Sequence, residues 1–218
     1  MPLQKTYETL FRHYGRQHWW PGETAFEVMV GSVLTQNTAW TNVEKAIANL
    51  KDADLLSAEK IVKTPHNRLA KLLRPSGYFN IKAKRLRSFC DWYISHGGWE
   101  TLSHWPTGKL RQALLAVNGI GPETADDMVL YAFHRPVFVI DAYTRRLFAR
   151  LGMVSGEEDY ETLRAVFEDR LKDLPPKKRS QLFNEYHALI VCHAKEVCKK
   201  KPVCGACCLA AQCRFGGK

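Results

Sequence analysis

The stretch Leu114-Leu-Ala-Val-Asn-Gly-Ile-Gly-Pro-Glu-Thr-Ala125 predicts two helices joined by a tight turn. An apolar helix end meets Gly119-Ile-Gly121, and Pro122 suits the first turn of a new helix. The glycines permit positive φ and let the backbone approach a ligand closely. Backbone N–H groups at the start of the second helix then point outward, where a phosphate can accept them. Such contacts would position a phosphate backbone without reading a base sequence, although the same pattern also suits an αα-hairpin that binds nothing.

Helical periodicity continues on both sides of this turn. Phe26, Val30, Val33 and Leu34 share one apolar face, and Thr41-Asn-Val-Glu44 predicts a capping box at the start of the next helix. Further helices are predicted at 69–73, 82–94, 109–116, 123–133, 142–151, 160–171 and 177–197, with breaks at 75–77 and 96–98 and a helix start after Pro106. Because strand alternation is nearly absent, the expected fold class is all-α.

The charge balance points to an anionic partner. The 218 residues carry 32 Lys and Arg against 22 Asp and Glu, a formal net charge of +10. Nucleic acid is the first candidate and acidic lipid the second. No segment approaches the roughly 18 apolar residues of a membrane span, and the N-terminal residues lack an apolar signal core. We therefore expect an intracellular protein of the cytoplasm or nucleoid, with no membrane partner.

Seven cysteines in a reducing compartment favour metal binding over disulfides. Cys198, Cys204, Cys207 and Cys213 are spaced C-x5-C-x2-C-x5-C. Four thiolates at this spacing suit zinc or a [4Fe–4S] cluster. Zinc ribbons more often contain two separated C-x2-C knuckles, and only one is present here. Of the other cysteines, Cys90 and Cys192 fit an apolar interior, and Cys208 is left out because it would disturb the spacing.

A carboxylate follows the hairpin. Val137-Phe-Val-Ile-Asp-Ala-Tyr-Thr-Arg-Arg146 places Asp141 after four apolar residues and at a helix start, the usual position of an N-cap. With the glycine turn about twenty residues upstream, this arrangement resembles the helix-hairpin-helix superfamily of DNA glycosylases. The resemblance implies that Asp141 lies at the mouth of a base pocket. Its carboxylate would stabilise the oxocarbenium-like sugar and help water attack the anomeric carbon.

The bifunctional branch of that superfamily, typified by endonuclease III, has a lysine two residues after the second glycine of the hairpin. The lysine forms a Schiff base with the sugar before strand cleavage. This chain has Glu123 at that position, so the resemblance supports base excision and argues against strand nicking. The resemblance also implies DNA contacts from the hairpin at Gly119, Gly121, Glu123 and Thr124.

The same branch carries C-x6-C-x2-C-x5-C after a His-Gly-(Arg or Lys) stretch. Here His193-Ala-Lys195 precedes the cysteines, and the first spacer is one residue shorter. The resemblance favours a [4Fe–4S] cluster over zinc at residues 198–213. Its expected task is structural, holding a loop that carries Lys199–Lys201 and Arg214 toward phosphates. A solvated basic loop is an equal alternative.

An aromatic segment resembles a narrower family. Trp19, Trp20 and Pro21, with Leu34-Thr-Gln-Asn-Thr38, resemble the endonuclease III-related 3-methyladenine DNA glycosylases. In that family the paired tryptophans and the proline line the base pocket, and an aromatic residue at the position of Trp40, more commonly Phe, stacks on the base. A 3-alkylated purine is cationic, so aromatic rings attract it by cation–π contact as well as stacking. Partial burial of the two tryptophans is the alternative.

Two further side chains are implied at the DNA. By resemblance, Gln36 would fill the gap left by an extruded nucleotide, because its amide both donates and accepts hydrogen bonds. Gly77-Tyr-Phe-Asn-Ile-Lys-Ala83 resembles the wedge loop of the family, with Tyr78 as the residue that opens the base stack. A surface glutamine and a core tyrosine are the alternatives.

The resemblance extends over nearly the whole chain and implies two helical domains with DNA across the cleft between them. Residues 24–136 would form the central domain with the hairpin, and residues 1–23 and 137–218 the terminal domain with the cluster loop. The expected protein is a monomeric, monofunctional glycosylase that removes alkylated purines from double-stranded DNA. Three alternatives are an endonuclease III-like glycosylase and lyase on oxidised pyrimidines, a mismatch-specific glycosylase and a non-catalytic iron–sulfur damage sensor.

Overall fold

The computed structural model describes residues 2–17, 19 and 22–216. Over these ranges no strand occurs, which confirms the all-α fold class, and no helix is long and apolar enough to cross a membrane. The α-helices are α1 Pro2–Tyr14, α2 Ala25–Leu34, α3 Trp40–Asp52, α4 Ala58–Lys63, α5 His66–Leu72, α6 Phe79–Ser95, α7 Gly98–Leu102, α8 Thr107–Leu115, α9 Pro122–Asp127, α10 Ala142–Leu151, α11 Tyr160–Asp169 and α12 Pro176–Glu196. The 3₁₀ turns are Arg74–Ser76, Cys204–Ala206 and Ala210–Gln212, and Met128–Ala132 is a π-helical turn.

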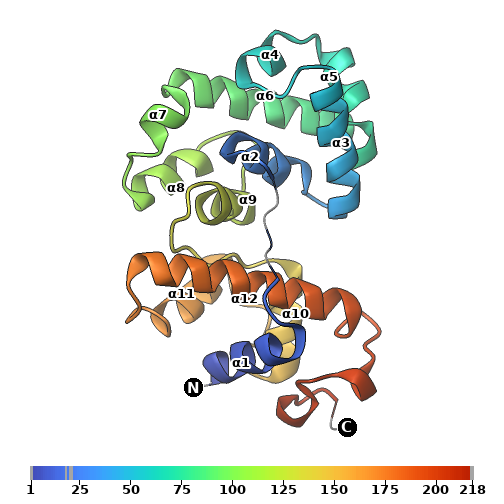
Figure 1. Ribbon diagram of the computed structural model, residues 1–218, viewed down its shortest axis with the longest axis vertical. Helices are drawn as coiled ribbons and strands as arrows, with labels where there is room; N and C mark the ends of the chain where they lie inside the picture. The colour runs from blue at the N-terminus through green and yellow to red at the C-terminus, as the bar shows by residue number, and fades with distance from the viewer. Residues whose placement is uncertain (1, 18, 20–21, 217–218) are drawn as a thin grey trace. The chain divides into compact units, whose positions relative to one another are not determined.

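The chain forms two compact units. One contains Trp20–Phe133, and the other joins Met1–Trp19 to His134–Lys218. In the first unit α2 is the central element, and its side chains from Glu27 to Leu34 are buried. Helices α3, α6 and α9 and the π-helical turn pack around it, while α4 and α5 pack along α6 (Figure 1). The apolar face predicted for α2 is therefore the core of this unit.

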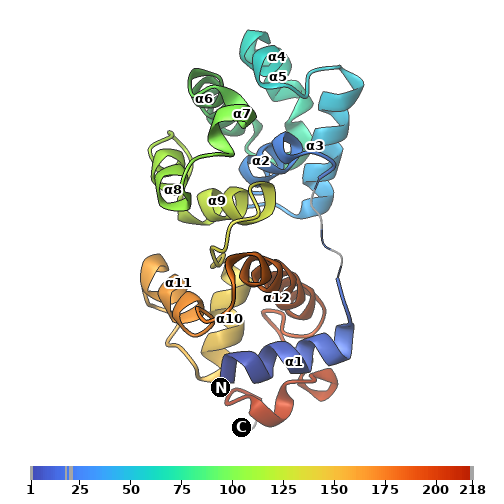
Figure 2. The same ribbon diagram turned by 60° about the vertical axis from the view of Figure 1, so that its left-hand side comes forward.

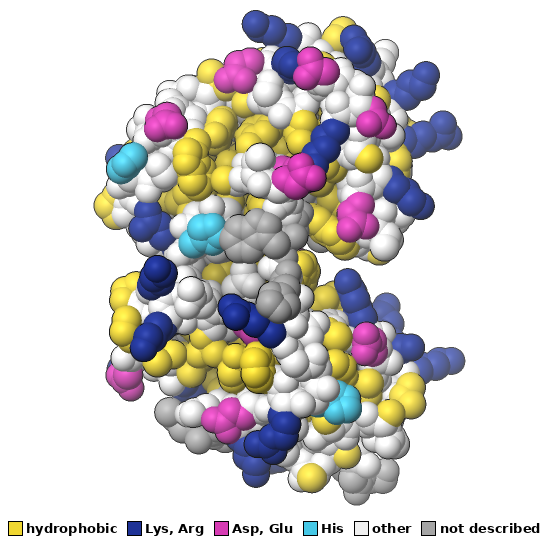
Figure 3. All heavy atoms as spheres, in the orientation of Figure 1, with side chains coloured by type: hydrophobic (Ala, Val, Ile, Leu, Met, Phe, Trp, Pro, Cys, Tyr) yellow, Lys and Arg dark blue, Asp and Glu magenta, His cyan; other side chains and the backbone are white. Residues whose placement is uncertain are grey.

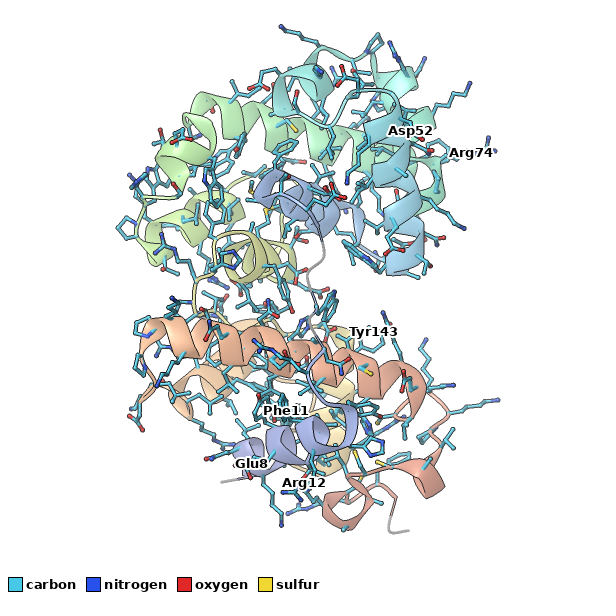
Figure 4. The ribbon with its side chains drawn as sticks, in the orientation of Figure 1. Glu8, Phe11, Arg12, Asp52, Arg74 and Tyr143 are labelled. Atoms are coloured by element: carbon cyan, nitrogen blue, oxygen red, sulfur yellow. The ribbon has the colours of Figure 1, made fainter. Side chains whose placement is uncertain are left out.

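The second unit is built around α12, against which α1 and α10 pack (Figure 2). Its interior is aromatic: the rings of Phe138 and Phe167 stack at 4.4 Å, and Phe138 meets Tyr186 edge-on at 5.8 Å. The Tyr186 hydroxyl donates to the carbonyl oxygen of Leu3 at 2.7 Å, which fixes α1 on α12. Figure 4 shows Phe11 on α1, where this side chain is 38% exposed.

Two helix boundaries differ from the sequence-based expectation. The prediction of a capping box at Thr41–Glu44 is wrong, because α3 begins at Trp40. Its N-cap is Ala39, which makes no side-chain hydrogen bond. Thr41 therefore already lies within the helix. The predicted helix 123–133 is also not uniform, since α9 ends at Asp127 and the backbone widens into the π-helical turn. The short helices α4 and α7 were not predicted, because one or two turns carry too little periodicity.

Candidate functional site

The glycine turn joins α8 to α9 as predicted, and Pro122 is the first residue of α9. Gly119 has φ +88°, and a Cβ atom at this position would lie 2.3 Å from Cγ of Arg85. Gly119 is thus required both by its backbone conformation and by the close approach of α6. Gly121 differs, because its φ of −91° suits any residue and a Cβ atom there would meet nothing within 4 Å. The fold does not require this glycine, and the space beside it is open.

A buried ion pair holds the two helices of the hairpin together. Arg111 on α8 donates to both carboxylate oxygens of Asp126 on α9, at 2.6 and 3.1 Å. The Asp126 side chain is fully buried and that of Arg111 is 15% exposed. Two parallel charge-assisted hydrogen bonds fix the relative orientation of the helices. The hairpin is therefore a rigid element of its unit.

Gln36 lies against this hairpin. Its Nε2 donates to the carbonyl oxygen of Gly119 at 2.9 Å and to the hydroxyl of Thr124 at 3.0 Å. Its Oε1 accepts from Nη1 of Arg85 at 2.5 Å. The structure thus brings together three residues that the sequence suggested separately and adds Arg85, which was missed. Thr124 is buried, and its hydroxyl faces Gln36. The amide of Gln36 must leave these partners before it can enter a DNA duplex.

Tyr78 and the loop before α6 are exposed. Tyr78 itself is 69% exposed, which excludes the alternative of a core tyrosine. Gly77 and Tyr78 both have positive φ, 70° and 44°. A positive φ is uncommon for a bulky residue and is a sign of local strain. The tyrosine is therefore held outward by the backbone that precedes it.

Lys82 connects the loops that carry Gln36 and Tyr78. Its Nζ donates to the carbonyl oxygen of Leu34 at 2.8 Å and to that of Ser76 at 2.6 Å, and the side chain is buried. Burial, with a smaller contribution from the positive charge of Arg85, lowers the pKa of Lys82 to about 8. One ammonium group therefore fixes the ends of both loops.

Trp40 is half-buried at the start of α3. Part of its indole packs on α2, since a Cβ atom at Gly31 would lie 3.0 Å from Cη2 of the ring. Trp40 also lines a hollow in which Nζ of Lys51 lies 3.0 Å from a carboxylate oxygen of Glu23 and of Glu27. The complete lining is Gly22, Glu23, Glu27, Trp40, Glu44, Ile47, Ala48 and Lys51. Three carboxylates and one ammonium give this aromatic hollow an excess of negative charge, which favours a cationic ligand.

Asp141 is the N-cap of α10, and the four apolar residues before it are buried. Its Oδ1 accepts from the backbone N–H of Thr144 at 2.7 Å, while its Oδ2 lies 3.5 Å from Nε2 of His187. The side chain is only 12% exposed. Burial raises the pKa of this carboxyl group, but His187 and the Thr144 N–H more than offset that effect and leave the pKa below its usual value. The carboxylate is therefore ionised at neutral pH. Tyr143, labelled in Figure 4, lies in the first turn of the helix that Asp141 caps.

His187 comes from α12 and was not among the residues that the sequence suggested. Its ring stacks on that of Trp19, with centroids 5.7 Å apart and planes 10° apart. Trp19 was predicted to line a base pocket, and in the structure it covers this histidine. Trp20 and Pro21, which share that prediction, lie outside the described residues. No local motif could have indicated His187, because only the packing of α12 against α10 brings it to Asp141.

The cysteine segment 198–213 contains the two 3₁₀ turns Cys204–Ala206 and Ala210–Gln212 and is otherwise made of bends, turns and irregular backbone. No disulfide links the seven cysteines, and Cys90 is buried as expected, whereas Cys192 is only half-buried. Burial, followed by the neighbouring Cys198, Cys213 and Cys204, raises the pKa of the Cys207 thiol. The other three cysteines of the predicted set therefore influence Cys207 electrostatically, and the cysteine thiolate is the donor type that iron–sulfur clusters bind. Among the described residues, no three His, Cys, Asp or Glu side chains gather as ligands of a single ion.

Two other side chains reach these sulfur atoms. Arg150 donates from Nη1 to Sγ of Cys198 at 3.2 Å and to the carbonyl oxygen of Lys199 at 2.6 Å. Nε2 of His193 lies 3.5 Å from Sγ of Cys207. Arg150 therefore fixes the basic stretch 199–201 to α10.

Elsewhere on the surface, Figure 3 shows Lys and Arg side chains along the outer edge of the Trp20–Phe133 unit.

The chain is similar to known DNA repair proteins. A family model described as HhH-GPD superfamily base excision DNA repair protein matches residues 30–173. The chain is 46% identical over 209 residues to "Putative DNA repair glycosylase MJ1434" of Methanocaldococcus jannaschii, covering 94% of this chain and 92% of that protein. It is 26% identical over 192 residues to endonuclease III of Sulfolobus acidocaldarius, covering 87% and 82% of the two chains.

Solved structures extend the likeness to the fold. The 3-methyladenine DNA glycosylase MagIII of H. pylori, solved with 1,N6-ethenoadenine, superposes with a TM-score of 0.75 at 31% identity, covering 89% of this chain and 96% of that one. An endonuclease III–DNA complex superposes with a TM-score of 0.82 at 21% identity, covering 99% and 95%. The matched family model and the 46% identical relative establish that this chain belongs to the HhH-GPD superfamily of base excision DNA repair proteins, among the endonuclease III-like DNA glycosylases.

Proposed function

We propose that the protein is a monofunctional DNA N-glycosylase that hydrolyses the N-glycosidic bond of flipped-out alkylated purines resembling 3-methyladenine. The observation that carries this proposal is the Asp141 carboxylate, which is ionised, mostly buried and held by its own helix, and which follows the hairpin in the chain. The proposed partner of the protein is double-stranded DNA that contains a damaged base. We expect a monomer to be sufficient for this activity.

In the proposed reaction the bond between the sugar and the base breaks, and its electron pair leaves with the base. A purine alkylated at N3 is already cationic, so it departs as a neutral molecule without prior protonation. The Asp141 carboxylate stabilises the positive charge that develops on the sugar. A water oxygen then bonds to the anomeric carbon, and its proton passes to Asp141 or to solvent.

The residue at the position of the lyase lysine supports a hydrolytic route. Glu123 is exposed at the position where the bifunctional branch has its lysine, and a carboxylate cannot form a Schiff base. Lys82 has a lowered pKa, but it is 1% exposed and its ammonium group donates to two carbonyl oxygens. It is therefore no substitute for the missing nucleophile.

The substrate class rests on charge and shape. Trp40 with Glu44, Glu23 and Glu27 offers an indole and excess negative charge, which suit a flat cationic ring. The 31% identical MagIII is described as a 3-methyladenine DNA glycosylase and was solved with 1,N6-ethenoadenine, a flat base. Trp20 and Pro21 lie outside the described residues and belong to this proposal through the resemblance alone.

We also propose a [4Fe–4S] cluster held by Cys198, Cys204, Cys207 and Cys213, with zinc as the alternative. These four thiolates would hold the cluster, which would cross-link the loop, and Arg150 holds the adjoining backbone. Iron and acid-labile sulfide analysis, with the visible absorbance of the purified protein, distinguishes the two metals. A stoichiometric zinc content without iron contradicts the cluster.

The activity is tested by chromatographic analysis of bases released from methylated DNA, with a panel of duplexes containing single lesions. Release of 3-methyladenine without strand cleavage is expected. Borohydride treatment should trap no covalent adduct, and an adduct would favour the glycosylase and lyase alternative. Release from mismatched duplexes alone would favour the mismatch-specific alternative. DNA binding with no base released from any lesion would favour the damage sensor.

A further inference from the structure

The two oxygens of the Asp141 carboxylate have different partners. Oδ1 accepts from the N–H of Thr144, which belongs to the same helix start. Oδ2 faces His187, which comes from α12 and is 4% exposed. The separation of 3.5 Å is at the outer limit of a hydrogen bond, so the contact is chiefly electrostatic. The N-cap bond uses Oδ1, whereas Oδ2 faces the imidazole of His187.

The ring of His187 is itself oriented. Trp19 covers one face of the imidazole in a nearly parallel stack, with planes 10° apart. A stacked, buried ring has little freedom to rotate about its side-chain bonds. Nε2 therefore points at Oδ2 because the tryptophan fixes the ring plane and α12 fixes the backbone.

We propose that His187 is a positioning residue that directs Oδ2 of Asp141 and favours its ionised form, and that Trp19 holds this histidine in place. The proposal rests on the proposed glycosylase function. In its Nε2–H form the imidazole presents a donor to the carboxylate. A protonated carboxyl group cannot stabilise a cationic sugar, so the donor matters even though it does not touch the substrate.

The electrostatics of the site agree with this assignment. Burial raises the pKa of Asp141, and His187 is the first of the groups that lower it, followed by Thr144. Removal of the donor therefore leaves the desolvation of the carboxylate less compensated and raises its pKa. The acid limb of the pH–rate profile should then move to higher pH.

Two variants separate the donor from the stacked ring. His187→Phe keeps an aromatic ring against Trp19 and removes the N–H, whereas His187→Gln keeps an N–H donor and removes the ring. We expect H187F to lower the single-turnover rate of base release on the order of 10-fold or more, with the acid limb shifted upward. H187Q should recover most of the rate. Affinity for DNA carrying an abasic-site analogue should stay the same in both variants.

A matched control comes from the other unit. His96 also lies over a tryptophan, Trp92, with ring centroids 5.0 Å apart, and its other contacts are Ser95 and Trp105 rather than a carboxylate. His96→Phe should leave rate and pH profile unchanged. Thermal unfolding of all variants shows whether a lost rate reflects a lost fold.

Several results overturn the proposal. A wild-type rate and acid limb in H187F would assign His187 to packing alone. If H187F and H187Q lose the same fraction of the base-release rate and the acid limb of the pH–rate profile does not move, His187 is likewise assigned to packing alone. If the wild-type protein releases no base, the glycosylase function fails, but the ¹³C NMR titration of the Asp141 carboxyl carbon in wild type and H187F still tests the histidine. An unchanged carboxyl pKa in H187F then refutes the proposed contact.

Discussion

Replacing Asp141 by asparagine separates the two tasks of its carboxylate. Asparagine and aspartate are about equally good N-caps, and the amide oxygen of asparagine can accept the Thr144 N–H that Oδ1 accepts at 2.7 Å. The charge is lost in this variant, while the helix start is kept. Asp141→Ala removes both.

The structure gives a different magnitude for each variant. Loss of the cap costs about 1 kcal/mol, and a buried N–H left without an acceptor costs roughly 1–3 kcal/mol. We therefore expect D141A to lower the free energy of unfolding by about 1–3 kcal/mol, and D141N by less than about 1 kcal/mol. In catalysis both variants lose the stabilisation of the cationic sugar, a loss on the order of 10²- to 10³-fold in rate.

Urea unfolding at pH 7 and single-turnover base release from one lesion duplex measure these two effects. The folded-state pKa of Asp141 is lowered, so its contribution to stability is present above the unfolded value near ~4 and is lost as pH falls through the folded value. The free energy of unfolding of D141N should not show this decrease at low pH. Wild-type base release by D141N would refute the catalytic role, and equal stability of D141A and D141N would refute the cap.

Three further predictions concern the hairpin unit. Gly119→Ala forces a Cβ to within 2.3 Å of Arg85 at φ +88°, so urea unfolding should show a loss of roughly 1–3 kcal/mol, whereas Gly121→Ala should be nearly neutral. If both variants unfold alike, the strain argument fails. Asp126→Asn leaves a buried guanidinium without its counter-ion and should cost about 3–5 kcal/mol, and a loss below about 1 kcal/mol would contradict the rigid pair. The pKa of Lys82, about 8 when folded, lies below the ~10.4 of an unfolded lysine, so its ionisation should make the free energy of unfolding rise with pH between these values. Lys82→Met should remove that part of the rise, and identical slopes in the two proteins would show that Lys82 does not titrate there.

Much of the fold follows from short-range pattern. The 3.6-residue periodicity predicted α2 and α6, and the Gly-Pro signal predicted the start of α9. The same local logic failed at Thr41, because Trp40 already belongs to α3 and Ala39 takes the cap position. Propensity rules describe which residue caps well, whereas packing decides where the helix starts.

The candidate site also contains residues that a local motif predicts and residues that only packing brings together. Asp141 could be suggested from the sequence because its motif is contiguous, and its N-cap geometry is as the pattern indicated. Arg85 and His187 could not be suggested, since each meets its partner only through packing between helices distant in the chain. The pairing of Gln36 with Thr124 was hidden for the same reason, although both residues were named. Contacts of this kind require the tertiary fold.

The three hydrogen bonds of Gln36 have a consequence for how the protein samples DNA. Each such bond contributes roughly 0.5–1.5 kcal/mol, and the bond to a guanidinium more. If Gln36 enters the DNA duplex, the free energy gained there must compensate for the loss of all three hydrogen bonds. Under the proposed function, intact and well-stacked base pairs resist opening, so the side chain would keep its three bonds while the protein is on undamaged DNA. A weakened base pair would lower the free energy needed to release Gln36, and its bonds to Gly119, Thr124 and Arg85 would then set that threshold.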